Sequence, residues 1–90
     1  MLNKKQIERL EDKLDRRSLS IEIAYHAIDR INQEDLSEEE KKGELIKRLD
    51  RIHDYSIEIR TIKDILSNLG YKAEPNTDET GIDHYSIERI

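Results

Sequence analysis

The hydrophobic positions of this chain fall into two long stretches with the spacing of an α-helix. Apolar residues recur at alternating steps of three and four from residue 7 to 31, and again from residue 45 to 69. This period matches a helical turn, so each stretch predicts an amphipathic helix. The expected apolar faces are Ile7, Leu10, Leu14, Ile21, Ala24, Ile28 and Ile31 in the first helix, and Leu45, Leu49, Ile52, Ile59, Ile62, Leu66 and Leu69 in the second.

The ends of both helices carry sequence signals. Asn3 can accept a hydrogen bond from the amide of Gln6, which is typical of a helix N-cap. Ser37 precedes three glutamates, whose carboxylates suit the positive end of a helix dipole. Gly70 follows the last apolar position, where glycine commonly ends a helix. The helices are therefore expected at about 4–33 and 38–69.

The short connection between the helices predicts an antiparallel pair. We therefore expect an all-α fold in which residues 1–70 form a coiled-coil-like two-helix hairpin. Arg17 occupies a position where the apolar pattern calls for a hydrophobic residue, and this pairing places it beside Ser56 and Ile59. It either forms a polar layer that fixes the register or extends its charged end to water.

Each helix also carries apolar residues away from its expected face. At about 100° per residue these lie on other sides of the helices and need a further surface. Single exposed apolar residues are common, but these cluster, so a symmetric dimer that forms a four-helix bundle is the expected arrangement. The predicted oligomer interface consists of Leu19, Ile23, Ala27, Ile46 and Ile57.

Residues 71–90 differ in composition from the helices. They contain five acidic residues against Lys72 and Arg89, and the stretch from Pro75 to Gly81 is polar and rich in turn-forming residues. We expect a short, irregular, acidic C-terminal tail. It either docks on the helical hairpin or stays mobile and binds a partner through its late apolar residues Tyr85, Ile87 and Ile90.

Composition excludes several classes of function. The chain has 16 basic and 21 acidic residues and a net charge of −5, concentrated in the tail, so nucleic acid is not an expected partner. It has no cysteine, no export signal and no apolar run long enough to cross a membrane, which makes a cytoplasmic protein the default. Its 90 residues, with neither Trp nor Phe, form at most a thin core.

Candidate catalytic chemistry is sparse. His26, His53 and His84 do not share a spacing typical of metal ligands, so no metal or cofactor site is predicted. Carboxylate pairs such as Glu11 and Asp15 are expected to be solvated on so charged a helix. No phosphate-binding loop or nucleophile motif is present, and we expect no catalytic residues and no enzyme activity.

The expected function is therefore protein–protein interaction, as an adaptor, regulator or inhibitor of a partner protein. Small regulators of this kind are typical of phages and mobile genetic elements. The alternative is an oligomer that sequesters a small molecule or nucleotide, with Arg17, Arg48 or Arg51 facing an intersubunit pocket. Leu49-Asp50 followed by Tyr55-Ser56 resembles a pattern in phage proteins that sequester cyclic-nucleotide signals. Those proteins are oligomeric helical hairpins, which is what the resemblance implies here.

Overall fold

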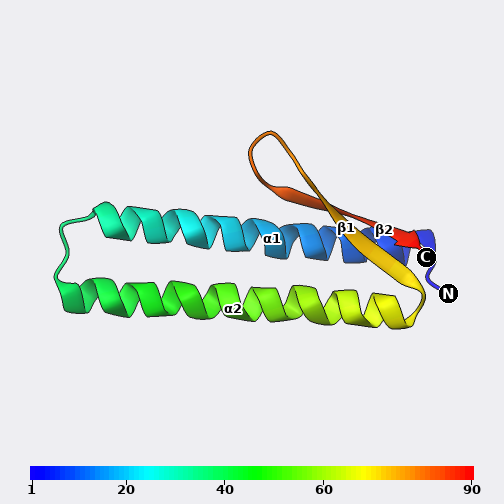
Figure 1. Ribbon diagram of the computed structural model, residues 1–90, viewed down its shortest axis with the longest axis horizontal. Helices are drawn as coiled ribbons and strands as arrows, with labels where there is room; N and C mark the ends of the chain where they lie inside the picture. The colour runs from blue at the N-terminus through cyan, green and yellow to red at the C-terminus, as the bar shows by residue number, and fades with distance from the viewer.

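The chain folds into two antiparallel helices with a two-stranded β-hairpin packed against one end. In the computed structural model, which describes all 90 residues, α1 spans Lys4–Gln33 and α2 spans Glu38–Asn68. Strands β1 (Tyr71–Thr77) and β2 (Asp83–Arg89) follow. The longest axis measures 53 Å, and both chain ends lie at the end that carries the β-hairpin (Figure 1). The predicted helical hairpin is confirmed.

The helix ends follow the sequence signals. Asn3 Oδ1 accepts the N–H of Gln6 at 2.8 Å, and Gln6 Oε1 accepts the N–H of Asn3 at 2.9 Å. These reciprocal bonds satisfy two amide groups that the first helical turn leaves unpaired. Ser37 Oγ accepts the N–H of Glu40 at 3.2 Å. Gly70 has φ of 85°, a conformation that is strained for residues with a side chain, and it turns the chain from α2 into β1.

The C-terminal segment is a β-hairpin, so the predicted irregular tail and all-α class are wrong. β1 and β2 pair antiparallel, from Tyr71 opposite Arg89 to Thr77 opposite Asp83. Pro75 lies opposite Tyr85, whose own N–H points away from β1 toward α1. This pair therefore occupies a position without hydrogen bonds between the strands, where the missing N–H of proline costs nothing.

The hydrophobic core lies under the β-hairpin. Leu14 of α1 and Leu66 of α2 are completely enclosed, and Tyr71, Tyr85 and Ile87 cover them from the strands. Alternate residues of a strand share one face, so Tyr85 and Ile87 face the helices together. Further from the β-hairpin the molecule consists of the two helices alone (Figure 1), with Ala24, Ile31 and Ile52 as the buried apolar residues there.

Part of the predicted helix seam is exposed. Leu49 and Leu69 were expected between the helices, yet 54% and 57% of their surfaces are accessible. An alternation of three and four averages about 3.5 residues per turn, whereas an α-helix has about 3.6. The predicted apolar face therefore rotates slowly around a long helix. The side of α2 that faces α1 therefore leaves these two positions outside the seam.

Candidate interaction surfaces

The residues predicted to form an oligomer interface are mostly exposed, on two different flanks. Ile23 of α1 is 58% exposed, and Ile46 and Ile57 of α2 are 50% and 46% exposed. At about 100° per residue, Ile46 and Ile57 lie more than 90° from the buried Ile52 and thus away from α1. The flank of α1 that carries Ile23 also bears Leu19, which is exposed, and Ala27, which is half-buried. These residues do not form one continuous patch.

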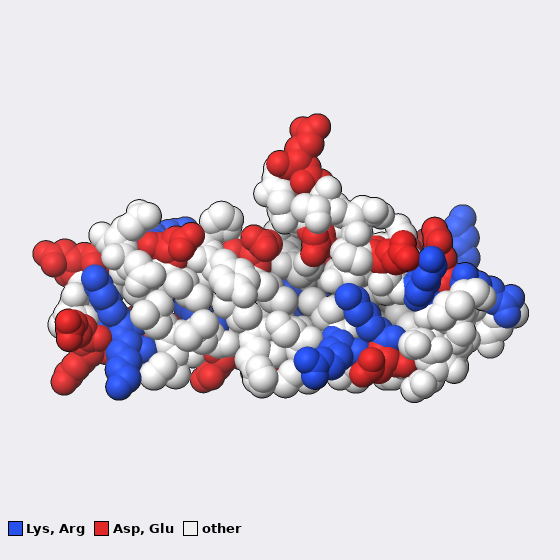
Figure 2. All heavy atoms as spheres, viewed as in Figure 1, with Lys and Arg blue, Asp and Glu red and all other residues white.

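A further apolar surface, which the sequence reasoning did not single out, lies beside the β-hairpin. Tyr25 follows the buried Leu14 by eleven residues, about three helical turns, so it lies on the side of α1 that the β-hairpin covers nearer the chain ends. Lys63 of α2 contacts Tyr85 of the β-hairpin. Leu49 lies fourteen residues before Lys63, about four turns, so it lies on the same side of α2. Tyr25 and Leu49 are both about half exposed. Figure 2 shows uncharged atoms along the middle of this face beyond the β-hairpin.

A small groove with only apolar side chains lies between the helices near the chain ends. Its volume is about 120 Å³, and Ile65 and Leu69 on its rim are each more than half exposed. The sequence pattern assigned Leu69 to the seam and did not mark Ile65. The lining consists of Leu2, Leu10, Ile62, Ile65, Leu66 and Leu69.

Two carboxylates of α1 hold the outer edge of β2. Asp15 Oδ1 accepts the N–H of Tyr85 at 2.6 Å, and Glu11 Oε2 accepts the N–H of Ile87 at 2.9 Å. Residues four apart on a helix are separated by about 6 Å along its axis, and residues two apart on a strand by about 6.7 Å. The two spacings match closely enough for both bonds to form. These carboxylates, expected to be solvated, therefore replace a neighbouring strand.

His84 connects the tip of the β-hairpin to α1. Its Nε2 lies 2.8 Å from Asp78 Oδ2, and its Nδ1 lies 3.6 Å from Asp15 Oδ2. Asp78 also accepts hydrogen bonds from the hydroxyl and N–H of Thr80 and from the N–H of Ile82. The bond to Asp78 raises the pKa of His84, and the Thr80 hydroxyl and His84 lower the pKa of Asp78.

The predicted partner-binding residues of the tail separate into two groups. Tyr85 and Ile87 belong to the core, and the ammonium of Lys63 lies 5.0 Å from the centre of the Tyr85 ring. Burial, the larger effect, and the charges of Asp83 and Asp15 raise the pKa of the Tyr85 hydroxyl. The expectation of a free recognition segment is therefore corrected for these two residues, and the docked alternative holds. Ile90 is 80% exposed, and its role stays a prediction.

The three arginines proposed for ligand binding lie in different surroundings. Arg17 pairs with Glu58 of α2 and lies 5.4 Å from the centre of the Tyr55 ring, so a partner already neutralises its charge. Ser56, its expected neighbour, instead donates to its own helix backbone at Ile52. Arg51 is exposed. The structure therefore does not bring Arg17, Arg48 and Arg51 into one site.

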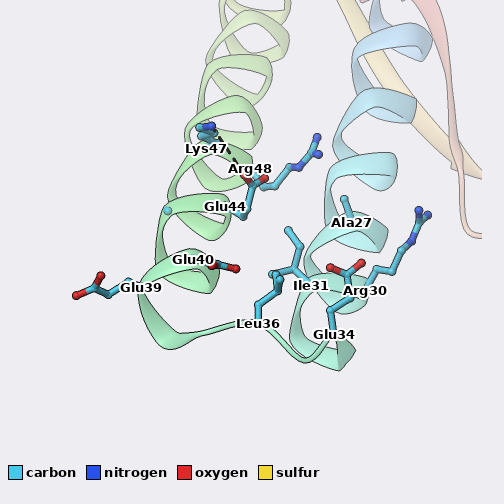
Figure 3. A pocket seen from close by; sticks show the side chains of 11 residues that line it. Ala27, Arg30, Ile31, Glu34, Leu36, Glu39, Glu40, Glu44, Lys47 and Arg48 are labelled. Atoms are coloured by element: carbon cyan, nitrogen blue, oxygen red, sulfur yellow. Dashed lines mark ion pairs between the residues drawn. The ribbon is translucent and has the colours of Figure 1, made fainter.

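Arg48 lines an open cleft of about 580 Å³ between the helices near their connection. Its side chain extends from α2 into the space between the helices, whereas Arg30 points away (Figure 3). The buried Nε of Arg48 has no hydrogen-bond partner. Four glutamates and three basic residues line this cleft, so its charge does not favour an anion: Glu34, Glu39, Glu40 and Glu44 against Arg30, Lys47 and Arg48.

The histidines and carboxylates do not gather into a group of three or more that could hold a metal ion. Neither helix combines the length and apolar composition needed to cross a membrane. Comparison with known protein families, curated proteins and solved structures finds no match to this chain. The surfaces described above are therefore the basis for a functional interpretation.

Proposed function

We propose that this chain is a non-enzymatic protein–protein interaction module that self-associates, most simply as a dimer, and regulates or bridges a partner protein. The supporting observation is the distribution of apolar side chains: ten large hydrophobic residues are exposed, whereas eight hydrophobic residues are buried. An isolated exposed leucine needs no explanation. A surplus spread over both helices, on sides that no other element covers, favours association.

The thin core supports the same proposal. Full burial of one Leu or Ile side chain contributes about 1.5–3 kcal/mol, and only Leu14 and Leu66 are almost completely enclosed. A second copy that covers Ile23 on α1 or Ile57 on α2, which are 58% and 46% exposed, would add about half of such a contribution at each residue. In a symmetric dimer one interaction is made twice, so few residues suffice.

Sedimentation velocity over a range of protein concentrations tests this proposal. We expect the wild-type chain to form dimers and the double variant Ile23→Glu/Ile57→Glu to remain monomeric. Because these residues lie on different flanks, the single variants identify the flank that forms the interface. Ile90→Glu is the matched control, since Ile90 is equally apolar and more exposed. A folded wild-type monomer at high micromolar concentration would contradict the proposal.

The alternative function is sequestration of a small molecule or nucleotide by an oligomer. The observation that favours it is the Nε of Arg48 in the cleft, a buried hydrogen-bond donor without a partner. A thermal-shift screen against nucleotides separates the two functions. A ligand that stabilises the wild-type chain but not Arg48→Ala would support sequestration. Two results together would support the interaction module. No nucleotide stabilises the wild-type chain in the screen, and the wild type captures a protein from cell extract that Ile23→Glu/Ile57→Glu does not capture.

A further inference from the structure

The two edges of the β-hairpin differ in how their backbone groups are satisfied. The outer edge of β2 bonds to Asp15 and Glu11 of α1. In the register of the hairpin, Tyr71, Ala73, Pro75 and Thr77 direct their backbone groups away from β2, and the sheet has no third strand. Ala73 therefore presents a free N–H and a free C=O. An open edge of this kind is a template for another strand.

We propose that two copies of this chain pair through the free edges of β1 and form a continuous four-stranded antiparallel sheet. This inference rests on the proposed self-association and assigns to it a contact that the helical flanks do not include. Strand addition at a sheet edge obtains affinity from main-chain hydrogen bonds and specificity from the side chains that become neighbours. Here the occupant of the edge is the same strand of a second copy.

Charge complementarity selects the second copy and one register. Lys72 and Glu74 lie on the exposed face of β1, where their side chains pair at 3.0 Å. With Ala73 opposite Ala73 of the second copy, Lys72 faces Glu74 of that copy and the reverse contact also forms. Each lysine then lies between two acidic neighbours, because Glu88 is its partner on β2. The adjacent registers would oppose Glu74 to Glu74 or Lys72 to Lys72.

Pro75 limits the extent of this pairing. In the favoured register it lies opposite Tyr71 of the second copy, at the end of the paired segment, so its missing N–H removes only a terminal bond. Longer pairings would place proline inside the ladder. The outer edges of the resulting sheet are the two β2 strands, which α1 already covers. The pairing therefore closes at two copies and does not propagate into a fibre.

Charge reversal provides the test, with the dissociation constant of the dimer as the readout. The single variants Lys72→Glu and Glu74→Lys each place like charges in opposition at two symmetric contacts. We expect each to weaken dimerisation by about tenfold or more. The double variant Lys72→Glu/Glu74→Lys restores opposite charges across the two-fold axis, so its affinity should return to near the wild-type value. Circular dichroism verifies that each variant is folded.

A second pair of variants tests the backbone bonds. Ala73→Pro removes the central N–H, whereas Thr77→Pro removes an equivalent outward N–H beyond the paired segment and is the matched control. We expect only Ala73→Pro to weaken the dimer, and the Ala73 amide to exchange more slowly as protein concentration rises.

The outcomes separate this inference from the proposed function. A dimer that dissociates with Ile23→Glu/Ile57→Glu but is unaffected by all the β1 variants would overturn the pairing of β1 and leave the interaction module standing. Failure of the double charge variant to recover affinity would also overturn the register. A wild-type chain that is monomeric at every concentration would overturn both.

Discussion

His84 is the residue whose protonation is most closely connected to the position of the β-hairpin. It faces Asp78 of the turn and Asp15 of α1, and the bond to Asp78 is the main cause of its raised pKa. Folding therefore favours the protonated imidazole. The resulting stabilisation is complete below the ordinary pKa of 6.5 and is lost as pH rises through the higher folded value. The pKa of Asp78 is lowered from 3.8 in the folded protein. Its contribution to stability is therefore complete above pH 3.8 and is lost as pH falls through the lower folded value.

We therefore expect the wild-type melting temperature to be higher at about pH 6 than at about pH 8, with the difference reduced in His84→Gln. Thermal denaturation followed by circular dichroism at the two pH values measures this effect. His26→Gln is the control, because His26 is exposed on α1 and has no ion-pair partner in the structure. An unchanged pH dependence in His84→Gln would show that the contact does not stabilise the fold.

Asp15 is the second residue with a measurable role at this junction. Asp15→Ala leaves the N–H of Tyr85 without its acceptor, and an unsatisfied, partly buried amide costs about 1–2 kcal/mol. We expect that loss in the free energy of unfolding, and faster hydrogen exchange at the Tyr85 amide. Asp12→Ala is the comparison, because Asp12 forms only an exposed pair with Arg16 and should cost about 0.5 kcal/mol or less. Equal effects would contradict a special role for Asp15.

At the scale of elements, the β-hairpin is part of the core. Ile87 is buried against Leu14 and Leu66, whereas Ile90, three residues later, is 80% exposed. We expect Ile87→Ala to lower the free energy of unfolding by about 2–4 kcal/mol, and Ile90→Ala to change it by less than about 0.5 kcal/mol. Urea denaturation measures both. Similar small values for the two variants would mean that the strands do not stabilise the helices.

Two glycines should respond to alanine in opposite directions. Gly43 lies inside α2 with open space where a Cβ would be, so Gly43→Ala should stabilise the protein by about 1 kcal/mol. Gly70 has equally open surroundings but a positive φ, so Gly70→Ala should destabilise it by about 1–2 kcal/mol through backbone strain. Denaturant unfolding of both variants is the measurement. Stabilisation by Gly70→Ala would contradict the turn described between α2 and β1.

The helices could be predicted from the sequence and the strands could not, for a physical reason. Helix periodicity and caps such as Asn3 and Ser37 are local, so they can be recognised from neighbouring residues. The strands depend on contacts between distant segments, and a proline inside a segment, such as Pro75 in β1, is more typical of a turn or an edge strand. The acceptor role of Glu11 and Asp15 could be recognised only once the edge of β2 was known. Their spacing of four residues was the available signal.

At the scale of the whole molecule, packing is uneven along the long axis. The β-hairpin and both helices enclose the core near the chain ends, and only the two helices form the half near the connection (Figure 1). Helices with few buried neighbours open more readily, so their amides exchange faster. In dilute solution we expect amides near Ile28 and Leu45 to exchange faster than those near Leu14 and Leu66. Mass spectrometry after hydrogen exchange measures this gradient, and uniform protection would contradict it.

The distribution of tyrosines also gives the molecule an intrinsic optical probe. The chain has four tyrosines and no tryptophan, and Tyr71 and Tyr85 both lie where the β-hairpin covers the helices. Tyrosine fluorescence therefore reports on the detachment of the strands, whereas far-ultraviolet circular dichroism is dominated by the two helices. A fluorescence transition that precedes the dichroism transition would reveal separate opening of the β-hairpin, and coincident transitions would show one cooperative unit.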